Sequence, residues 1–138
     1  MNYWLMKSEP ETWSWKQQVK AGSKGEGWDG VRNYQASNNM KKMEIGDLCF
    51  FYHSVKERDI VGIVKVVKKY HPDPTDKSKR FGMVSVAAVK ALKNKVNPSQ
   101  IKEHPKLNHL ALVKQSRLSV MPIDKKSWTI ICNLGGIK

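Results

Sequence analysis

The sequence has few cysteines and no spacing that suits a metal ion. Cys49 and Cys132 lie far apart, each in an apolar stretch, and no CxxC or HxxxH pair occurs. Both thiols are therefore predicted to be small buried side chains, and neither a disulfide nor a zinc site is expected. We expect no metal and no cofactor.

Long hydrophobic runs are also missing. The longest, at 60–67 and 83–89, have the length of strands and fall well short of the roughly 20 residues of a membrane helix. The N-terminus lacks the apolar stretch of a secretory signal. We expect no membrane partner and an intracellular protein, cytoplasmic or, in a eukaryote, nuclear. Because no linker or repeat divides the chain, residues 1–138 are predicted to form a single domain.

Acidic residues are scarce in the second half of the chain. The formal net charge is +13; up to residue 64, nine lysines and arginines accompany eight acidic residues, and beyond it sixteen accompany four. Such one-sided charge favours a polyanionic partner, DNA or RNA, over a merely solvated lysine-rich surface. The candidate phosphate contacts are Lys65, Lys68, Lys69, Lys79 and Arg80.

The predicted elements follow one another in an irregular order. Strands are expected at 2–7, 48–54, 59–69, 81–92 and 112–121, with the second and third paired around a turn at 55–58. Helices are expected from a cap at Thr12 to about Lys20, and at 32–43, 98–104 and 125–133, with loops at 22–30 and 71–80. Strands mixed with short helices, without βαβ alternation, predict an α+β fold with a barrel-like mixed sheet and peripheral helices.

The segment at 27–36 combines side chains that neither surface loops nor cores usually hold together. Trp28, Asp29, Arg32 and Asn33 crowd between and after glycines. This mixture suits a pocket that stacks a flat ligand and contacts its polar edge. We expect Trp28 to be the stacking platform and to contribute little to the core.

The sequence does not support a catalytic site or a dinucleotide cofactor site. The GxGxxG match at 25–30 lacks the preceding strand that a dinucleotide site requires, and no GxSxG elbow occurs. His53 and Ser54 are adjacent in a predicted strand, so they point to opposite faces and cannot pair directly. The chain is therefore not expected to be an enzyme. The alternatives are a small enzyme acting on a nucleotide or nucleobase, using Glu9 and His53 as acid and base, and a protein-interaction module.

Motifs along nearly the whole chain resemble one family. They are YWLMKSEP at 3–10, WDGVRNYQA at 28–36, NNM at 38–40, GD at 46–47, FYHS at 51–54, VGI at 61–63, YHPDPT at 70–75 and QSRLSV at 115–120. In this order they are similar to the EVE domain family of the PUA-like superfamily, and to its small stand-alone members related to the thymocyte nuclear protein group. The resemblance implies a PUA-like pseudo-barrel of mixed strands. It also implies a domain that binds modified bases in DNA or RNA, related to the YTH domains that hold a methylated adenine in an aromatic cage.

The residues and the resemblance together assign a base-binding pocket. Its predicted members are Ser8, Glu9, Trp28, Asp29, Arg32, Asn33, His53 and Ser54. Trp28 would stack on the base, and Asn33 would offer a donor and an acceptor to its edge. Glu9 and Asp29 would support the pocket by holding Arg32. A regular strand lets only one of His53 and Ser54 face the base, and the sequence leaves both possible.

The basic second half predicts salt-dependent binding to any oligonucleotide. Each phosphate contact contributes a slope of roughly −0.7 to −0.9 to a plot of log affinity against log salt. A titration from low to moderate salt is therefore expected to show a steep fall in affinity. A flat response would remove the electrostatic argument for nucleic acid.

Overall fold

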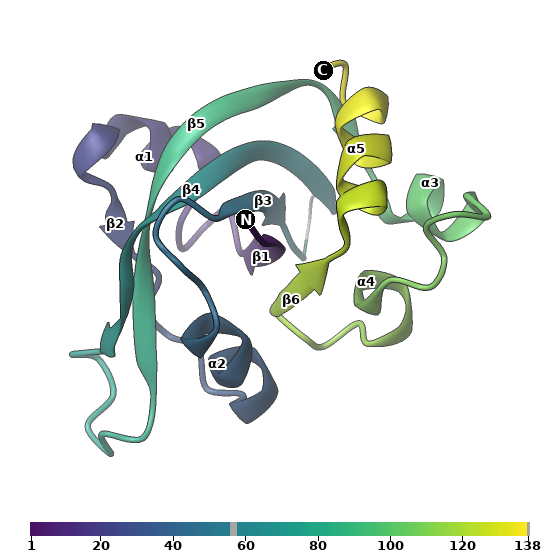
Figure 1. Cartoon of the computed structure of the whole chain (residues 1–138). Helices are drawn as coiled ribbons and strands as arrows, with labels where there is room; N and C mark the ends of the chain where they lie inside the picture. Colours follow the sequence, from purple (N-terminus) through teal and green to yellow (C-terminus); the bar gives the residue numbers. More distant parts are fainter. Residues whose placement is uncertain (56–57, 138) are drawn as a thin grey trace.

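The computed structural model describes residues 1–55 and 58–137. Lys56 and Glu57, which belong to the predicted turn at 55–58, and Lys138 lie outside the described residues. The chain folds into a mixed sheet with short helices around it, which confirms the predicted α+β class (Figure 1).

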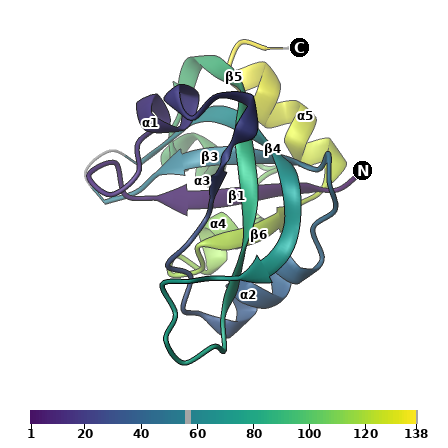
Figure 2. The ribbon, with the colours of Figure 1, turned by 90° about the vertical axis from the view of Figure 1, so that its left-hand side faces the viewer.

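One sheet of six strands organises the molecule. The strands are β1 (Tyr3–Ser8), β2 (Glu26–Gly27), β3 (Leu48–His53), β4 (Asp59–Pro72), β5 (Gly82–Val96) and β6 (Val120–Ile123). They are ordered β2-β5-β4-β3-β1-β6. The β1–β3 pair is parallel and the other pairs are antiparallel. Figure 2 shows β1 between β3 and β6, so its carboxyl end has a neighbour on each side.

The two long strands give the sheet its barrel-like curve. β4 and β5 arch over β1 and β3 in Figure 1, and their register shifts at four places along the pair. Each such irregularity adds local bend and twist to the ribbon. The curved sheet therefore wraps around its own apolar side chains, as the predicted pseudo-barrel requires.

The helices are short, and most of them begin at side-chain caps. They are α1 (Trp15–Lys20), α2 (Tyr34–Lys41), α3 (Pro98–Glu103), α4 (Ala111–Lys114) and α5 (Lys125–Leu134), with a 3-10 turn, η1, at Gly22–Lys24. The predicted cap at Thr12 is wrong, because the N–H groups of Thr12 and Trp13 donate to the Glu9 carbonyl in a turn. Ser14 caps α1 instead, in a reciprocal capping box with Gln17. Among the described residues, no helix is long and apolar enough to cross a membrane.

Two further predictions of secondary structure are wrong. The expected strand at 112–121 is instead α4, a turn and the short β6, because the polar run at 114–117 interrupts the apolar alternation. The expected loop at 22–30 contains β2, whose two residues pair with Val86 and Ser85 of β5. The β2 pairing places the following Trp28 against the sheet, with its N–H donating to the Val84 carbonyl at 2.8 Å.

The aromatic core lies between β3 and α5. Phe50 stacks on Trp128 with ring centroids 3.9 Å apart, and Tyr3 stacks on the same indole at 4.6 Å. Trp4 and Trp128 are both buried. Cys49 is buried, and burial raises the pKa of its thiol far above the usual value, with the nearby Asp47 carboxylate adding to the shift.

Gly62 is a position where the fold has no room for a side chain. It pairs with Phe51, and a Cβ built on it would overlap the ring of Trp15. Gly62→Ala is expected to lower the free energy of unfolding by about 1–3 kcal/mol, the usual cost of overpacking. Urea denaturation measures the loss. In a Trp15→Ala background the same substitution is expected to cost much less, and equal losses in both backgrounds would contradict the steric explanation.

Candidate nucleic-acid interface

Two cavities meet at the carboxyl end of β1. The first, of about 580 Å³, is called the acidic cavity, and it is lined by Lys7, Ser8, Glu9, Thr12, Trp13, Glu26, Gly27, Trp28, Asp29 and Gly30. These residues come from the end of β1, the turn that follows it, and the segment containing β2. The cavity brings together four of the eight predicted pocket residues, namely Ser8, Glu9, Trp28 and Asp29.

Trp28 lines the acidic cavity but is also part of the core. Its side chain is only 7% exposed and packs edge-on against Phe51, with ring centroids 5.3 Å apart. The expectation that Trp28 would contribute little to the core is wrong, because β2 pairing draws the residue onto the sheet. Its stacking role stays a prediction. Truncation to alanine would remove core packing along with any ligand contact, so it cannot separate the two.

A second tryptophan in this cavity was missed from the sequence. Trp13 is partly buried, and its indole N–H donates to Gln18 Oε1 at 2.9 Å, which fixes the ring orientation. The Ser8 hydroxyl donates to the Trp13 carbonyl at 2.6 Å and holds the turn against the strand end. The sequence places this aromatic residue shortly after the strand end at 8–10. Binding residues are common in the loops that follow strands, so this position could have indicated a role for Trp13.

The acidic cavity carries three carboxylates and one ammonium group. Glu9, Glu26 and Asp29 are acidic and Lys7 is basic. Carboxylates accept hydrogen bonds and repel anions, so this cavity suits a ligand edge that donates N–H groups. Two tryptophan rings in the same lining provide flat apolar surface for such a ligand.

Arg32 has a structural partner that the sequence did not reveal. Its Nη1 lies 3.0 Å from Oδ2 of Asp73, and its Nη2 donates to the Thr75 hydroxyl at 2.9 Å. The expectation that Glu9 or Asp29 holds Arg32 is therefore wrong. The Asp73 carboxylate also accepts from the Gly30 N–H at 2.9 Å, so it fastens the segment after Trp28 to the β4–β5 connection.

Hydrogen bonds keep the Asp73 carboxylate ionised. Burial alone would raise the pKa of Asp73, but hydrogen bonds from Thr75, Gly30 and Arg32 outweigh it and hold the pKa below the usual value. Asp76 acts similarly a few residues later. Hydrogen bonds from the Ser78 hydroxyl and from the N–H groups of Phe81, Ser78 and Arg80 lower the pKa of Asp76 to about 2, against an opposing effect of burial.

The other predicted pocket residues lie outside the acidic cavity. Asn33 caps α2 by accepting from the Ala36 N–H at 2.9 Å, and it lines a smaller neighbouring hollow. His53 is 8% exposed, and its Nε2 accepts from the Trp15 N–H at 3.0 Å. Ser54 faces the second cavity. The alternation of β3 thus turns His53 toward Trp15 and the core, and leaves Ser54 at the surface of the strand end.

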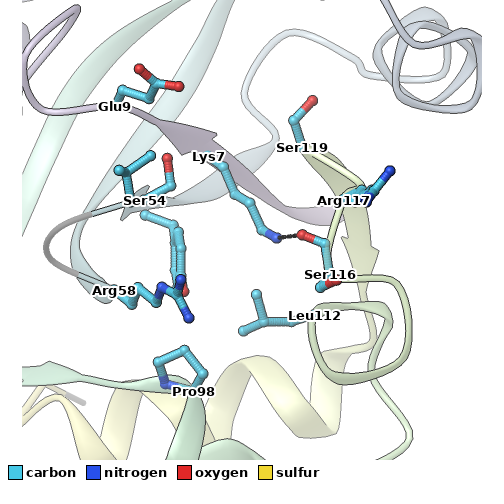
Figure 3. A pocket seen from close by; sticks show the side chains of 11 residues that line it. Lys7, Glu9, Ser54, Arg58, Pro98, Leu112, Ser116, Arg117 and Ser119 are labelled. Atoms are coloured by element: carbon cyan, nitrogen blue, oxygen red, sulfur yellow. Dashed lines mark hydrogen bonds between the residues drawn. The ribbon is translucent and has the colours of Figure 1, made fainter.

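The second cavity, of about 630 Å³, lies on the other side of the β1 end and is called the basic cavity (Figure 3). It is lined by Lys7, Glu9, Tyr52, Ser54, Val55, Arg58, Pro98, Leu112, Ser116, Arg117 and Ser119. Lys7 Nζ donates to the Ser116 carbonyl at 2.8 Å and lies 5.6 Å from the centre of the Tyr52 ring. Lys7 and Glu9 belong to both cavities.

The predicted phosphate contacts are exposed but do not line either cavity. Lys65, Lys68 and Lys69 lie on β4, and Lys69 forms an ion pair with Glu44 at 3.1 Å. Lys79 and Arg80 lie in the β4–β5 connection. Their role stays a prediction.

The described part of the chain holds no cluster of three or more His, Cys, Asp or Glu side chains that could bind a metal ion.

The curved mixed sheet with its peripheral helices defines a PUA-like α+β protein. The EVE domain matches residues 2–134, and the chain belongs to the EVE domain family. Mouse thymocyte nuclear protein 1 is 34% identical to it, over 96% of this chain and 73% of the mouse protein.

Solved structures share the fold over the whole length. A crystal structure of a protein from Agrobacterium tumefaciens has a TM-score of 0.97 and 46% identity, covering 99% of this chain and 94% of that one. Human THYN1 protein, in complex with 5-methylcytosine-containing DNA, has a TM-score of 0.90 and 29% identity, covering 100% and 99%. A YTH domain of Zygosaccharomyces rouxii, with a TM-score of 0.57, 16% identity and coverage of 99% and 88%, shares the fold.

The depressed pKa values predict an acid-resistant β4–β5 connection. A carboxylate with a lowered pKa stabilises the fold above the ordinary aspartate value near 3.9, and this contribution is lost as the pH falls through the folded pKa. The amide signals of Arg80 and Phe81, which donate to Asp76, are expected to keep their positions at pH 4 and to shift as the pH approaches about 2. Asp76→Asn is expected to move both signals at neutral pH. If the amide signals of Arg80 and Phe81 instead shift with midpoints near pH 4, hydrogen bonds do not lower the pKa of Asp76.

Proposed function

We propose that this protein binds nucleic acid and accepts a flipped, modified base in the acidic cavity without transforming it. The main observation behind the proposal is that Ser8, Glu9, Trp28 and Asp29 line one cavity. The chain around this cavity has a net charge of +13, which favours an anionic partner. Extrusion of a base costs a few kcal/mol, which stacking and hydrogen bonds to its edge must offset. The cavity contains groups for both interactions.

The charge of the cavity favours a base with an exocyclic amino group. Cytosine and adenine present such a donor, and carboxylates such as Glu9 and Asp29 are suitable acceptors for it. Phosphate groups would be repelled by the same carboxylates and would instead follow the basic surface outside. The cavity therefore separates the base from the backbone of the strand.

The relatives favour a methylated cytosine as the first ligand to test. Human THYN1 protein, which covers nearly the same length of chain, is in complex with 5-methylcytosine-containing DNA. We infer the same class of ligand for this protein, which we expect in the cytoplasm or, in a eukaryote, in the nucleus. The mouse relative is named a nuclear protein, which agrees with an intracellular location.

Geometry favours binding over catalysis. Acid–base work on a nucleobase by Glu9 and His53 would need both groups at one ligand. Glu9 lines both cavities, whereas His53 lines neither, and its Nε2 already accepts a hydrogen bond from the Trp15 backbone. These positions support a non-catalytic module.

A comparison of methylated and unmodified duplexes tests the proposal. Fluorescence anisotropy is expected to show tighter binding to a duplex with one 5-methylcytosine than to the same duplex with cytosine. Asp29→Ala is expected to weaken binding of the methylated duplex by about tenfold to a hundredfold, since a good polar contact to a base contributes about 1–3 kcal/mol. Glu103→Gln, which removes an exposed carboxylate on α3, is the matched control and is expected to have no effect. Equal affinity for both duplexes in the wild-type protein would refute modified-base recognition.

The absence of chemistry is tested separately. Prolonged incubation with nucleosides, nucleotides and methylated oligonucleotides is expected to leave every mass unchanged in mass spectrometry. If turnover is observed and is lost in Glu9→Ala or His53→Ala, the protein is a small enzyme and the proposal of a non-catalytic binding module is wrong.

A further inference from the structure

Among its described lining residues, the basic cavity holds an excess of positive charge. Lys7, Arg58 and Arg117 line it, and among the described residues of the lining Glu9 is the one acidic side chain. No ion pair joins any of these three cations to another residue within 1–55 or 58–137. Uncompensated cations in a partly enclosed space are a recurring feature of sites that bind anions.

Two of the cations face each other across the cavity. In Figure 3, Lys7 and Arg58 extend toward the same space from opposite sides, above Leu112 and Pro98, whereas Arg117 points away from its centre. Burial lowers the pKa of Lys7, and the positive charge of Arg58 lowers it further. An anion placed between the two side chains would relieve their mutual repulsion.

The donors around this space match the acceptors of a phosphate group. One N–H of Lys7 is engaged by the Ser116 carbonyl, which leaves two for a ligand, and the guanidinium of Arg58 presents a planar fork. The hydroxyls of Ser54 and Ser119 lie in the same lining. The apolar side chains of Leu112 and Pro98 exclude water on one side, which strengthens electrostatic attraction.

We propose that the basic cavity binds a phosphate group of the same nucleic acid strand whose base enters the acidic cavity, with Lys7 and Arg58 as the contacting residues. This inference rests on the proposed nucleic-acid function. The two cavities share Lys7 and Glu9, so they adjoin at the end of β1 and differ in charge. A nucleotide has the same division, because its base edge donates hydrogen bonds and its phosphate is an anion. The site is distinct from the lysines predicted on β4.

The salt dependence of binding tests the phosphate contact. The double variant Lys7→Met/Arg58→Gln keeps the aliphatic stem at residue 7 beside Tyr52 and removes both charges. On an unmodified duplex, its log–log salt slope is expected to be less steep than that of the wild-type protein by about 0.9, the contribution of one phosphate contact. Lys126→Gln is the control, because α5 packs at the opposite end of β1, where Trp128 meets Tyr3. Its slope is expected to stay unchanged.

Controls for folding and ligand source complete the experiment. Thermal melting is measured for every variant, and Arg58→Gln alone serves if the double variant does not fold. An unchanged slope in a folded variant overturns the proposal.

Inorganic phosphate and cytidine monophosphate are titrated at constant ionic strength, and both are expected to bind at least tenfold more weakly than the oligonucleotide. If cytidine monophosphate binds as tightly as the oligonucleotide, a free nucleotide is the ligand and the strand assignment is wrong. Because the duplex is unmodified, a failure of methylcytosine recognition leaves this test intact.

Discussion

The parallel pairing of β1 with β3 is the constraint on which both cavities depend. Ser8 lies opposite His53, and the N–H of Ser54 donates to the Ser8 carbonyl at 2.9 Å beyond the last pair. Parallel strands end at the same edge of a sheet, so the polar residues that close β1 and β3 gather at one place. On the other side of β1, the N–H of Lys7 donates to the Ser119 carbonyl, which draws the segment before β6 to the same edge.

Charge divides this edge into two parts. The acidic cavity presents Glu9, Glu26 and Asp29 beside two indole rings, and the basic cavity presents Lys7 and Arg58 above apolar side chains. A ligand that is uniformly anionic would fit only one of them. We propose a nucleotide as the ligand of both, because its base and its phosphate have opposite electrostatic requirements. This separation of acidic and basic groups, more than the total charge of +13, would orient a bound ligand. It distinguishes this surface from one that is only basic.

Local sequence patterns predicted the parts of the fold that depend on neighbours in the chain. The strands at the start of the chain and on either side of residues 55–58, the final helix, and the burial of Cys49 follow from apolar alternation and from caps. One prediction failed because strand pairing overrode a local preference. The glycine-rich stretch at 22–30 favours a loop, yet β2 forms because β5 offers it an unpaired edge.

The sequence by itself determined the chemistry available at the site: Ser8 and Glu9 at a strand end, Trp28 and Asp29 in one short segment, and a basic second half. Only the tertiary structure decided the partners. Arg32 pairs with Asp73, 41 residues away, and His53 turns inward to Trp15, 38 residues away. Spacing along the chain cannot predict such contacts, because they depend on the register of β3, β4 and β5 and on the packing of the connections between them. The same long-range register brings Arg58 opposite Lys7.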